Sequence, residues 1–318
     1  MKNKVHYSVD DGFDLLSKKT ELPLDEYTAI TDRQAEIESC LAQHVSTFST
    51  VIPGAFARKT LISPLAGCEI SLFVLFKHEL NARYLPAKLL DKLLVTLKHK
   101  YPDAILSKKY NAVLVPFENF AFRVQPGFLT PKNAYLVPAL AWQGWVDYHS
   151  LAYKTRLSKA DLAHKGKLLP VIRMIKSWNH VTGSLFDDYY LEIMVCDVLK
   201  DYEIRQYSTA LCHVFKSALK EVVYKKNDPA NPEFEIEGLR DVADLVSAML
   251  HFQQASKLAK RAVAHEEDGH IELALESWRT CLPGSFPSLM DMVIGQIRRR
   301  GIVGAEALQL MRDVFDQS

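Results

Sequence analysis

The chain has 318 residues, of which 48% are hydrophobic and 24% charged, and its formal net charge is +1. This length accommodates one large domain or two modest ones with real hydrophobic cores. A nearly neutral charge supplies no overall basic field, so neither nucleic acid nor a membrane surface is an expected partner. The first residues show no apolar signal core, and no run approaches the roughly 20 apolar residues of a membrane span.

Five cysteines are scattered along the chain, at Cys40, Cys68, Cys196, Cys212 and Cys281. They form no CxxC pair and no Cys/His ligand spacing, so we expect neither a disulfide framework nor a structural zinc site. Reduced thiols are typical of cytoplasmic proteins, and we predict that location.

The first 150 residues mix helical and strand patterns. Apolar residues recur at helical spacing over 26–50, and Pro53-Gly54 interrupts that helix. Residues 68–76, CEISLFVLF, are typical of a strand buried on both faces, and 86–100 predict a leucine-rich helix. Further strands are predicted at 111–117 and 120–128, as a hairpin, and at 133–139.

After about residue 150 the pattern is almost entirely helical. Pro170 stands where a first helical turn tolerates proline, and an apolar repeat predicts a long helix over 239–269. The segment NDPANPEFE at 227–235 predicts a polar loop. We therefore predict an α+β domain over residues 1–150 and a helical domain over 151–318, with a ligand cleft between them.

One stretch carries a chemical motif. Residues 54–76, GAFARKTLISPLAGCEISLFVLF, begin with a glycine turn and a short helix and lead into a strand with an acid at Glu69. The arrangement resembles the nucleotidyltransferase pattern of Gly-Ser followed, about a dozen residues later, by acid-x-acid on a strand. Four later segments also resemble that family in order: FRVQPGF at 122–128, LLPVIRMIKSW at 168–178, YYLEIMV at 189–195 and GHIELALESWRTCLPGSFP at 269–287.

Taken together, residues 26–287 resemble the bacterial cyclic GMP-AMP synthase-like nucleotidyltransferases (CD-NTases), relatives of the oligoadenylate synthetases. The resemblance implies a polymerase-β-like nucleotidyltransferase core, a mixed sheet with helices and an N-terminal spine helix. A helical oligoadenylate-synthetase-like C-terminal domain follows. It also implies a site in which three carboxylates hold two metal ions.

Compared with that pattern, three of the expected positions are altered. The first acid is Glu69, but the second is Ser71, the third aligns with Arg123, and the serine of the turn is Ala55. One carboxylate does not balance two divalent ions. A guanidinium ~4 Å from a metal would be repelled by several kcal/mol at an effective dielectric constant of about 20.

Small shifts of the alignment do not restore the site. Residues 70–76, ISLFVLF, contain no second acid, and the acid closest to position 123 is Glu118 in the predicted hairpin turn. We therefore interpret Glu69, Ser71 and Arg123 as a degenerate catalytic site with no metal ligand set, in which Arg123 hydrogen-bonds to Glu69 and neutralises it.

Six positions remain candidates for ligand binding: Gly54, Ala55, Lys59, Thr60, Lys176 and Glu192. The helix that follows Gly54 offers free backbone N–H groups to a phosphate. Lys59 alternatively is an ordinary solvated lysine. Lys176 aligns with the family's triphosphate-binding lysine, and alternatively pairs with Glu192 in a purely structural role.

Other conspicuous residues have simpler interpretations. Arg298 to Arg300 are expected at a helix end, where positive charge is favourable. Asp187 and Asp188 precede a helix and predict an N-cap. We expect Trp178 and Trp278 to be core residues and His251 to be packed or at the surface.

Three functions are compatible with these patterns. The first is a pseudoenzyme that binds a nucleotide, a cyclic oligonucleotide or a protein partner, in the bacterial antiphage defence setting that the resemblance implies. The second is an active nucleotidyltransferase that makes an oligonucleotide second messenger with NTP and Mg²⁺ at an atypical site. The third is a regulatory protein-binding partner that binds no nucleotide. No cofactor is expected unless the second holds.

Overall fold

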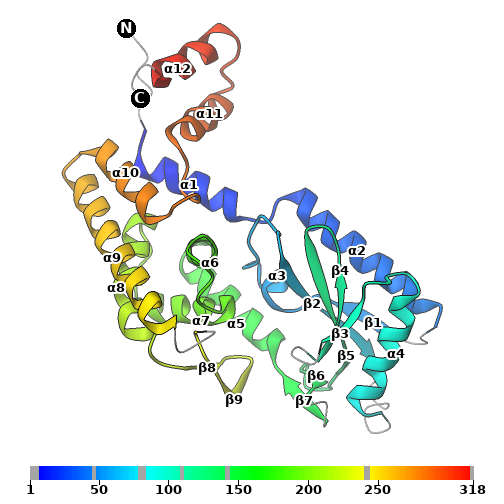
Figure 1. The fold of residues 1–318 in the computed structure, drawn as a ribbon. Coiled ribbons are helices and arrows are strands. Elements are labelled where there is room, and N and C mark those ends of the chain that lie inside the picture. The colour runs from blue at the N-terminus through cyan, green and yellow to red at the C-terminus, as the bar shows by residue number, and fades with distance from the viewer. Residues whose placement is uncertain are drawn as a thin grey trace. The chain divides into compact units, whose positions relative to one another are not determined.

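The computed structural model describes residues 7–44, 48–77, 84–107, 111–139, 144–239 and 244–315. The chain divides into two compact units (Figure 1). We call residues 22–162 and 227–235 the sheet unit, and residues 1–21, 163–226 and 236–318 the helical unit.

The sheet unit is built on a seven-stranded sheet. Its strands are β1 (Phe48–Val51), β2 (Cys68–Phe76), β3 (Ile105–Ser107), β4 (Ala112–Pro116), β5 (Phe120–Leu129), β6 (Tyr135–Pro138) and β7 (Trp145–Tyr148). Its helices are α2 (Leu24–Ala42), α3 (Gly54–Arg58), α4 (Pro86–Lys98) and α5 (Ser150–Ala163). A hairpin of β8 (Lys226–Asp228) and β9 (Asn231–Ile236) completes the list.

The strand order is β1-β2-β5-β4-β3, and β6 joins β5 to β7. Strands β2 and β5 run parallel over nine paired residues, whereas the other neighbours are antiparallel. The sheet is therefore mixed, as the sequence predicts.

One face of this sheet is the core of the unit. Side chains alternate along a strand, so every second residue of β2 and β5 points to the same face. On the buried face lie Ile70, Leu72 and Val74 of β2 and Phe122 and Val124 of β5. They join the apolar residues of α2 and α4 in one cluster. The intervening residues, Glu69, Ser71 and Arg123 among them, consequently lie on the opposite face.

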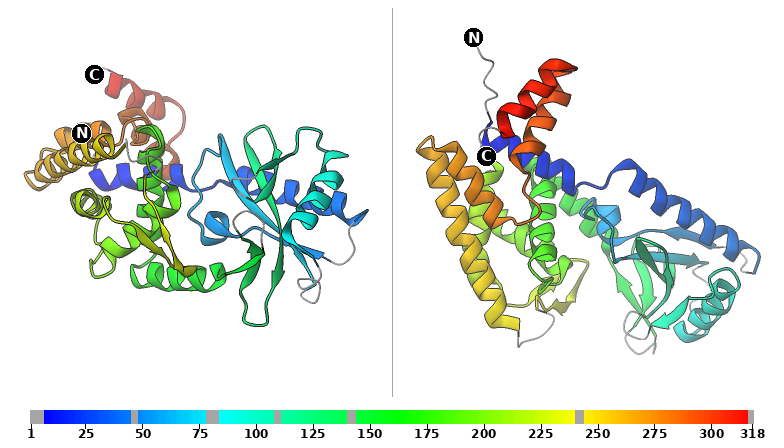
Figure 2. Two further views of the ribbon diagram at one scale, coloured as in Figure 1. Left: turned by 60° about the horizontal axis from the view of Figure 1, so that its bottom comes forward. Right: turned by 45° about the horizontal axis from the view of Figure 1, so that its top comes forward.

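The helical unit contains α1 (Val9–Thr20), α6 (Leu168–Val181), α7 (Asp188–Leu199), α8 (Tyr207–Glu221), α9 (Leu245–Glu267), α10 (Ile271–Cys281), α11 (Leu289–Arg300) and α12 (Ala305–Phe315). Helix α9 runs beside α10 (Figure 2). Phe13 of α1 is fully buried, with its ring centroid 4.9 Å from that of Trp278 and 5.1 Å from that of Phe286. Trp178 is also buried, so both tryptophans are core residues as expected.

Several predicted elements need correction. The helix predicted over 26–50 ends at Ala42, and the strand β1 begins at Phe48, because the β-branched and aromatic residues near 50 pair with β2. The loop predicted at 227–235 is the β8–β9 hairpin. Helix α1 is not predicted by the sequence pattern, although a capping box of Ser8 and Asp11 marks its start.

The predicted domain boundary near residue 150 also differs from the observed division. Residues 1–21 belong to the helical unit, since α1 packs Phe13 into its core, and residues 151–162 of α5 belong to the sheet unit. The hairpin joins the sheet unit because Ala230 O accepts a hydrogen bond from His149 N at 2.8 Å. The first part of the long helix predicted over 239–269 includes residues 240–243, which lie outside the described residues.

We expect Phe13→Ala to destabilise the helical unit by about 3–5 kcal/mol, because it leaves a cavity beside two aromatic rings. The free energy of unfolding is measured by denaturant titration, with the fluorescence of the neighbouring Trp278 as the probe. Val303→Ala, at a position that is 80% exposed, is the control. A loss below about 1 kcal/mol for Phe13→Ala would contradict the packing of α1 into this core.

Candidate functional site

The glycine turn before α3 adopts a backbone conformation that suits glycine. Gly54 has a φ of +73°, in the left-handed region, and an added Cβ would meet no atom within 4 Å. The constraint is therefore conformational rather than steric. Helix α3 has only five residues, and its C-cap Lys59 is also left-handed, with a φ of 60°.

Two neighbours of this turn differ in exposure. Lys59 is exposed, whereas Thr60 is fully buried and its backbone N donates to Ala55 O at 2.9 Å. Backbone hydrogen bonds thus tie the short helix to the chain that follows it. Phosphate binding by this turn stays a prediction.

Parallel pairing of β2 with β5 brings together Glu69, Ser71 and Arg123. Ser71 is the direct partner of Arg123 in the register of the two strands, and Glu69 stands two residues before Ser71 on the same face. The Glu69 and Arg123 side chains are 34% and 30% exposed. The three side chains that the sequence aligns with the catalytic triad therefore share one partly open patch of the sheet.

Arg123 contacts both of its neighbours in this patch. Its Nη2 donates a hydrogen bond to Ser71 Oγ at 3.0 Å, and its Nε lies 3.9 Å from Glu69 Oε2. The expected pairing with Glu69 is thus present as an ion pair, but this separation is longer than the hydrogen bond that the sequence analysis predicted. The cause is the register, which places Arg123 opposite Ser71 rather than opposite Glu69.

These residues do not fit a pair of divalent ions. Mg²⁺ prefers carboxylate oxygens, and the patch offers one carboxylate, which already faces a guanidinium, and one neutral hydroxyl. Within the described ranges, no group of three or more His, Cys, Asp or Glu side chains is placed to hold a metal ion. We derive no metal-dependent step for the chain as it stands.

Sequence patterns did not predict that α2 contacts α3 and the loop between α3 and β2. Glu26 Oε1 accepts a hydrogen bond from Leu65 N at 3.1 Å, on the loop between α3 and β2. The ring of Tyr27 stacks on that of Phe56 in α3, with centroids 5.1 Å apart and planes at 23°. Both contacts join residues distant in sequence, so helical periodicity gives no sign of them. They make α2 the element that positions the glycine turn.

In the helical unit, Lys176 and Glu192 form a buried ion pair. Lys176 Nζ lies 3.0 Å from Glu192 Oε2, and the side chains are 2% and 0% exposed. The structural alternative considered for these residues is therefore present. A further role of Lys176 in ligand binding stays a prediction, as does joint action with Lys59, which lies in the sheet unit.

The two acidic residues at the start of α7 have different hydrogen-bond partners. Asp187 is the predicted N-cap and accepts from Tyr189 N and Tyr190 N. Asp188 instead pairs with His180 Nε2 at 2.8 Å. Burial raises the pKa of the Asp188 carboxyl, but the His180 hydrogen bond and nearby positive charge outweigh it, so this pKa lies below its ordinary value.

The arginine run has the expected place. Arg298 to Arg300 form the last turn of α11, which ends at Gly301 with a φ of 64°. Arg299 reaches back to Asp11 of α1 at 3.1 Å. These arginines stabilise a helix end and its packing, as the charge pattern predicts.

Comparison with known proteins gives a consistent assignment of this architecture. Residues 7–160 match the Second Messenger Oligonucleotide or Dinucleotide Synthetase (SMODS) domain. The fold is similar to CdnC of E. coli MS115-1 in its complex with HORMA-deltaN, with a TM-score of 0.66, 15% identity, and coverage of 88% of this chain and 99% of that one. Residues 7–160 are thus similar to a SMODS domain, and the coordinates have the CD-NTase fold.

A second solved structure has a similar fold, and one curated relative has a similar sequence. The cyclic AMP-GMP synthase DncV of Vibrio cholerae has a TM-score of 0.60 at 11% identity, over 81% of this chain and 77% of that one. A probable cyclic nucleotide synthase of Bacillus cereus (strain VD146) is 23% identical over 203 residues. That match spans 60% of this chain and only 60% of the relative. At these identities the coordinates establish the CD-NTase fold.

Among the helices in the described ranges, none is both long enough and apolar enough to cross a membrane.

We expect Lys176→Met to lower the free energy of unfolding by about 3–5 kcal/mol, because it removes the cation beside a fully buried carboxylate. The double variant Lys176→Met/Glu192→Leu should recover most of that loss, since it replaces both charges with apolar groups. Denaturant unfolding of the two variants measures the difference. Equal stability of Lys176→Met and the wild type would show that the pair is not a structural element.

Proposed function

We propose that this chain is a catalytically degenerate CD-NTase-like protein that binds the phosphates of a nucleotide or cyclic oligonucleotide without a metal ion. The setting we propose, from the family resemblance, is bacterial antiphage defence. The observation that supports the degenerate site is the Arg123 guanidinium beside Glu69 and Ser71 at the centre of the β2–β5 pair.

Charge explains why such a patch suits phosphate. Three carboxylates would carry about three negative charges and would need metal ions before a triphosphate could approach. Glu69 and Arg123 together are close to neutral, so this barrier is absent. A guanidinium is also the side chain best suited to phosphate oxygens, because its N–H groups form a planar fork.

The neighbouring residues support the same ligand class. The Arg123 side chain is about one-third exposed, so part of it is open to solvent. The exposed Lys59 at the end of α3 adds a cation to the same unit. The CD-NTase structures of similar fold include CdnC with ATP and DncV with a linear pppApG intermediate, so the architecture accommodates phosphorylated nucleotides in those proteins.

The direct test is calorimetric titration of ATP, GTP and cyclic dinucleotides in EDTA. We expect binding by the wild type and binding about ten- to a hundredfold weaker in Arg123→Gln, because a charged hydrogen-bond donor is lost. Lys132→Gln, at an exposed position in the turn after β5, is the matched control and should bind normally. Binding that requires Mg²⁺, or an unchanged Arg123→Gln, would contradict the proposal.

Restoring the acids tests whether these positions are the remnant of a catalytic site. We expect Ala55→Ser/Ser71→Asp/Arg123→Asp to incorporate radiolabelled NTP in Mg²⁺ or Mn²⁺, since three carboxylates would again face one point. Ala55→Ser/Ser71→Asn/Arg123→Asn, of similar volume without the charges, should remain inactive, as should the wild type.

Two other outcomes of the incorporation assay would lead to different conclusions. Equal incorporation by the wild type would favour an active nucleotidyltransferase with an atypical site. A folded acid-restored variant that neither binds metal nor incorporates nucleotide would overturn the assignment of Glu69, Ser71 and Arg123 as the former metal-binding positions.

A further inference from the structure

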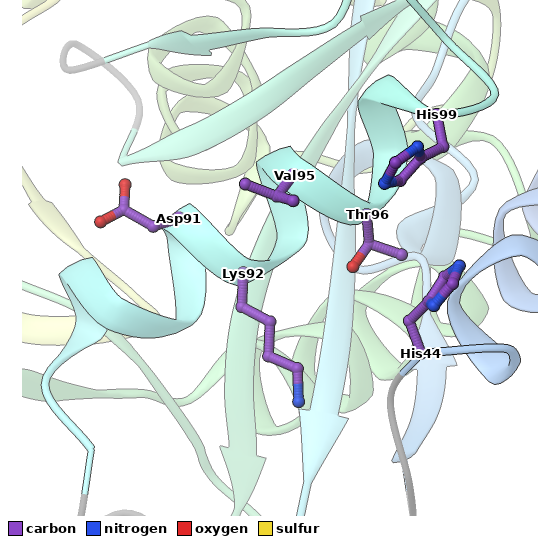
Figure 3. Close-up of a pocket in the computed structure, with 6 residues that line it drawn as sticks. All are labelled: His44, Asp91, Lys92, Val95, Thr96 and His99. Carbon is purple, nitrogen blue, oxygen red and sulfur yellow. The ribbon is translucent and has the colours of Figure 1, made fainter.

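A pocket of about 380 Å³ lies in the sheet unit, away from the β2–β5 patch. It is formed by the end of α2 and one face of α4 and is lined by His44, Asp91, Lys92, Val95, Thr96 and His99 (Figure 3). The nucleotide-binding proposal does not involve these residues. Its composition is unusual because two histidines meet there from different helices.

The two imidazoles are close enough to share a ligand. The ring centroids of His44 and His99 are 5.8 Å apart, and their planes differ by 32°. A transition metal binds imidazole nitrogen at ~2.0–2.1 Å, so two rings that share one ion have centroids roughly 5 to 6 Å apart. Both side chains are exposed, and neither makes a hydrogen bond or ion pair with the described residues. Small side-chain rotations are therefore free to bring both nitrogens onto one ion.

Helix ends determine which charge is favoured here. His99 is the C-cap of α4, and His44 follows the C-terminal end of α2, where its N donates to Leu41 O at 3.0 Å. The C-terminal end of a helix carries a partial negative charge. Two such ends at one pocket favour a cation and disfavour a phosphate.

Other groups at the pocket set limits on the ligand. The Lys92 ammonium opposes a cation, but it lies at the end of a flexible, exposed stem that points away from His99 (Figure 3). Asp91 lies farther along α4 and points away from them (Figure 3). Cys40, one turn before His44, is buried and donates to Thr96 O at 3.7 Å. Burial also raises the pKa of that thiol, so Cys40 is not available as a thiolate ligand.

We propose that His44 and His99 form a binding site for a divalent transition metal ion of the zinc class, with water in the remaining coordination positions. Neutral imidazole is the side chain best suited to Zn²⁺ and Cu²⁺ among the groups that line the pocket. With two protein ligands instead of four, the site binds more weakly than a structural zinc centre. A bound ion would join the end of α2 to the end of α4 and so stabilise the sheet unit.

A second histidine pair serves as an internal control. His265 and His270 have ring centroids 6.2 Å apart with planes at 70°. His270 is the N-cap of α10, at the positive end of a helix where a cation is disfavoured, whereas His265 lies in the last turn of α9, at a negative end. The two pairs have similar ring separations and differ in electrostatic surroundings.

The test is calorimetric titration of Zn²⁺ into the metal-free full-length chain. We expect one equivalent to bind, and the His44→Ala and His99→Ala variants each to bind about a hundredfold more weakly, because chelation by two linked ligands becomes a single contact. The double variant His265→Ala/His270→Ala should bind as the wild type does. Zn²⁺ should also raise the melting temperature of the wild type and of this control, but not of the His44 or His99 variants.

Spectroscopy adds a measurement whose expected change cannot result from misfolding of a variant. With Cu²⁺, the electron paramagnetic resonance spectrum should show coupling to two imidazole nitrogens in the wild type and to one in either single variant. Both side chains are exposed, so without metal the variants should melt at the wild-type temperature. Unchanged Zn²⁺ affinity in both single variants, or stabilisation by inorganic phosphate in place of Zn²⁺, would overturn the proposal.

Discussion

The parallel pairing of β2 with β5 is the constraint on which the candidate site depends. It brings residues more than fifty positions apart into register and, through the alternation of side chains, puts Glu69, Ser71 and Arg123 on one face. The same alternation sends Leu72 and Val124 into the core beneath α2 and α4. A shift of one residue would bury the charged side chains and expose the apolar ones, so the core itself maintains the geometry of the patch.

Around that pair, the molecule uses charge in two different ways. In the sheet unit, Arg123 is about one-third exposed, and its guanidinium contacts a carboxylate and a hydroxyl. In the helical unit, Lys176 is enclosed with Glu192, and this ion pair joins two helices. The two cations therefore differ in exposure, since solvent reaches the side chain of Arg123 but not that of Lys176.

Some elements of the structure could be predicted from sequence patterns, and others could not. The glycine turn, the acid at Glu69 and the order of the later segments predicted the CD-NTase fold, which the comparisons support. The β4–β5 hairpin, the leucine-rich α4 and the N-cap at Asp187 were also predictable, because periodicity and capping are local signals. Helix α1 and the β8–β9 hairpin were not, because distant contacts stabilise them, such as Phe13 on Trp278 and Asn231 on Asp147.

The sequence alone determined which side chains stand at the positions that the family resemblance aligns with three carboxylates, and that the third of them is the cation Arg123. Only the tertiary structure decided what that cation touches, since the strand register directs Arg123 to Ser71 at 3.0 Å and leaves Glu69 at 3.9 Å. The meeting of His44 with His99 was likewise invisible in the sequence. Residue identity follows from the chain, whereas distances between remote side chains depend on how separate elements pack.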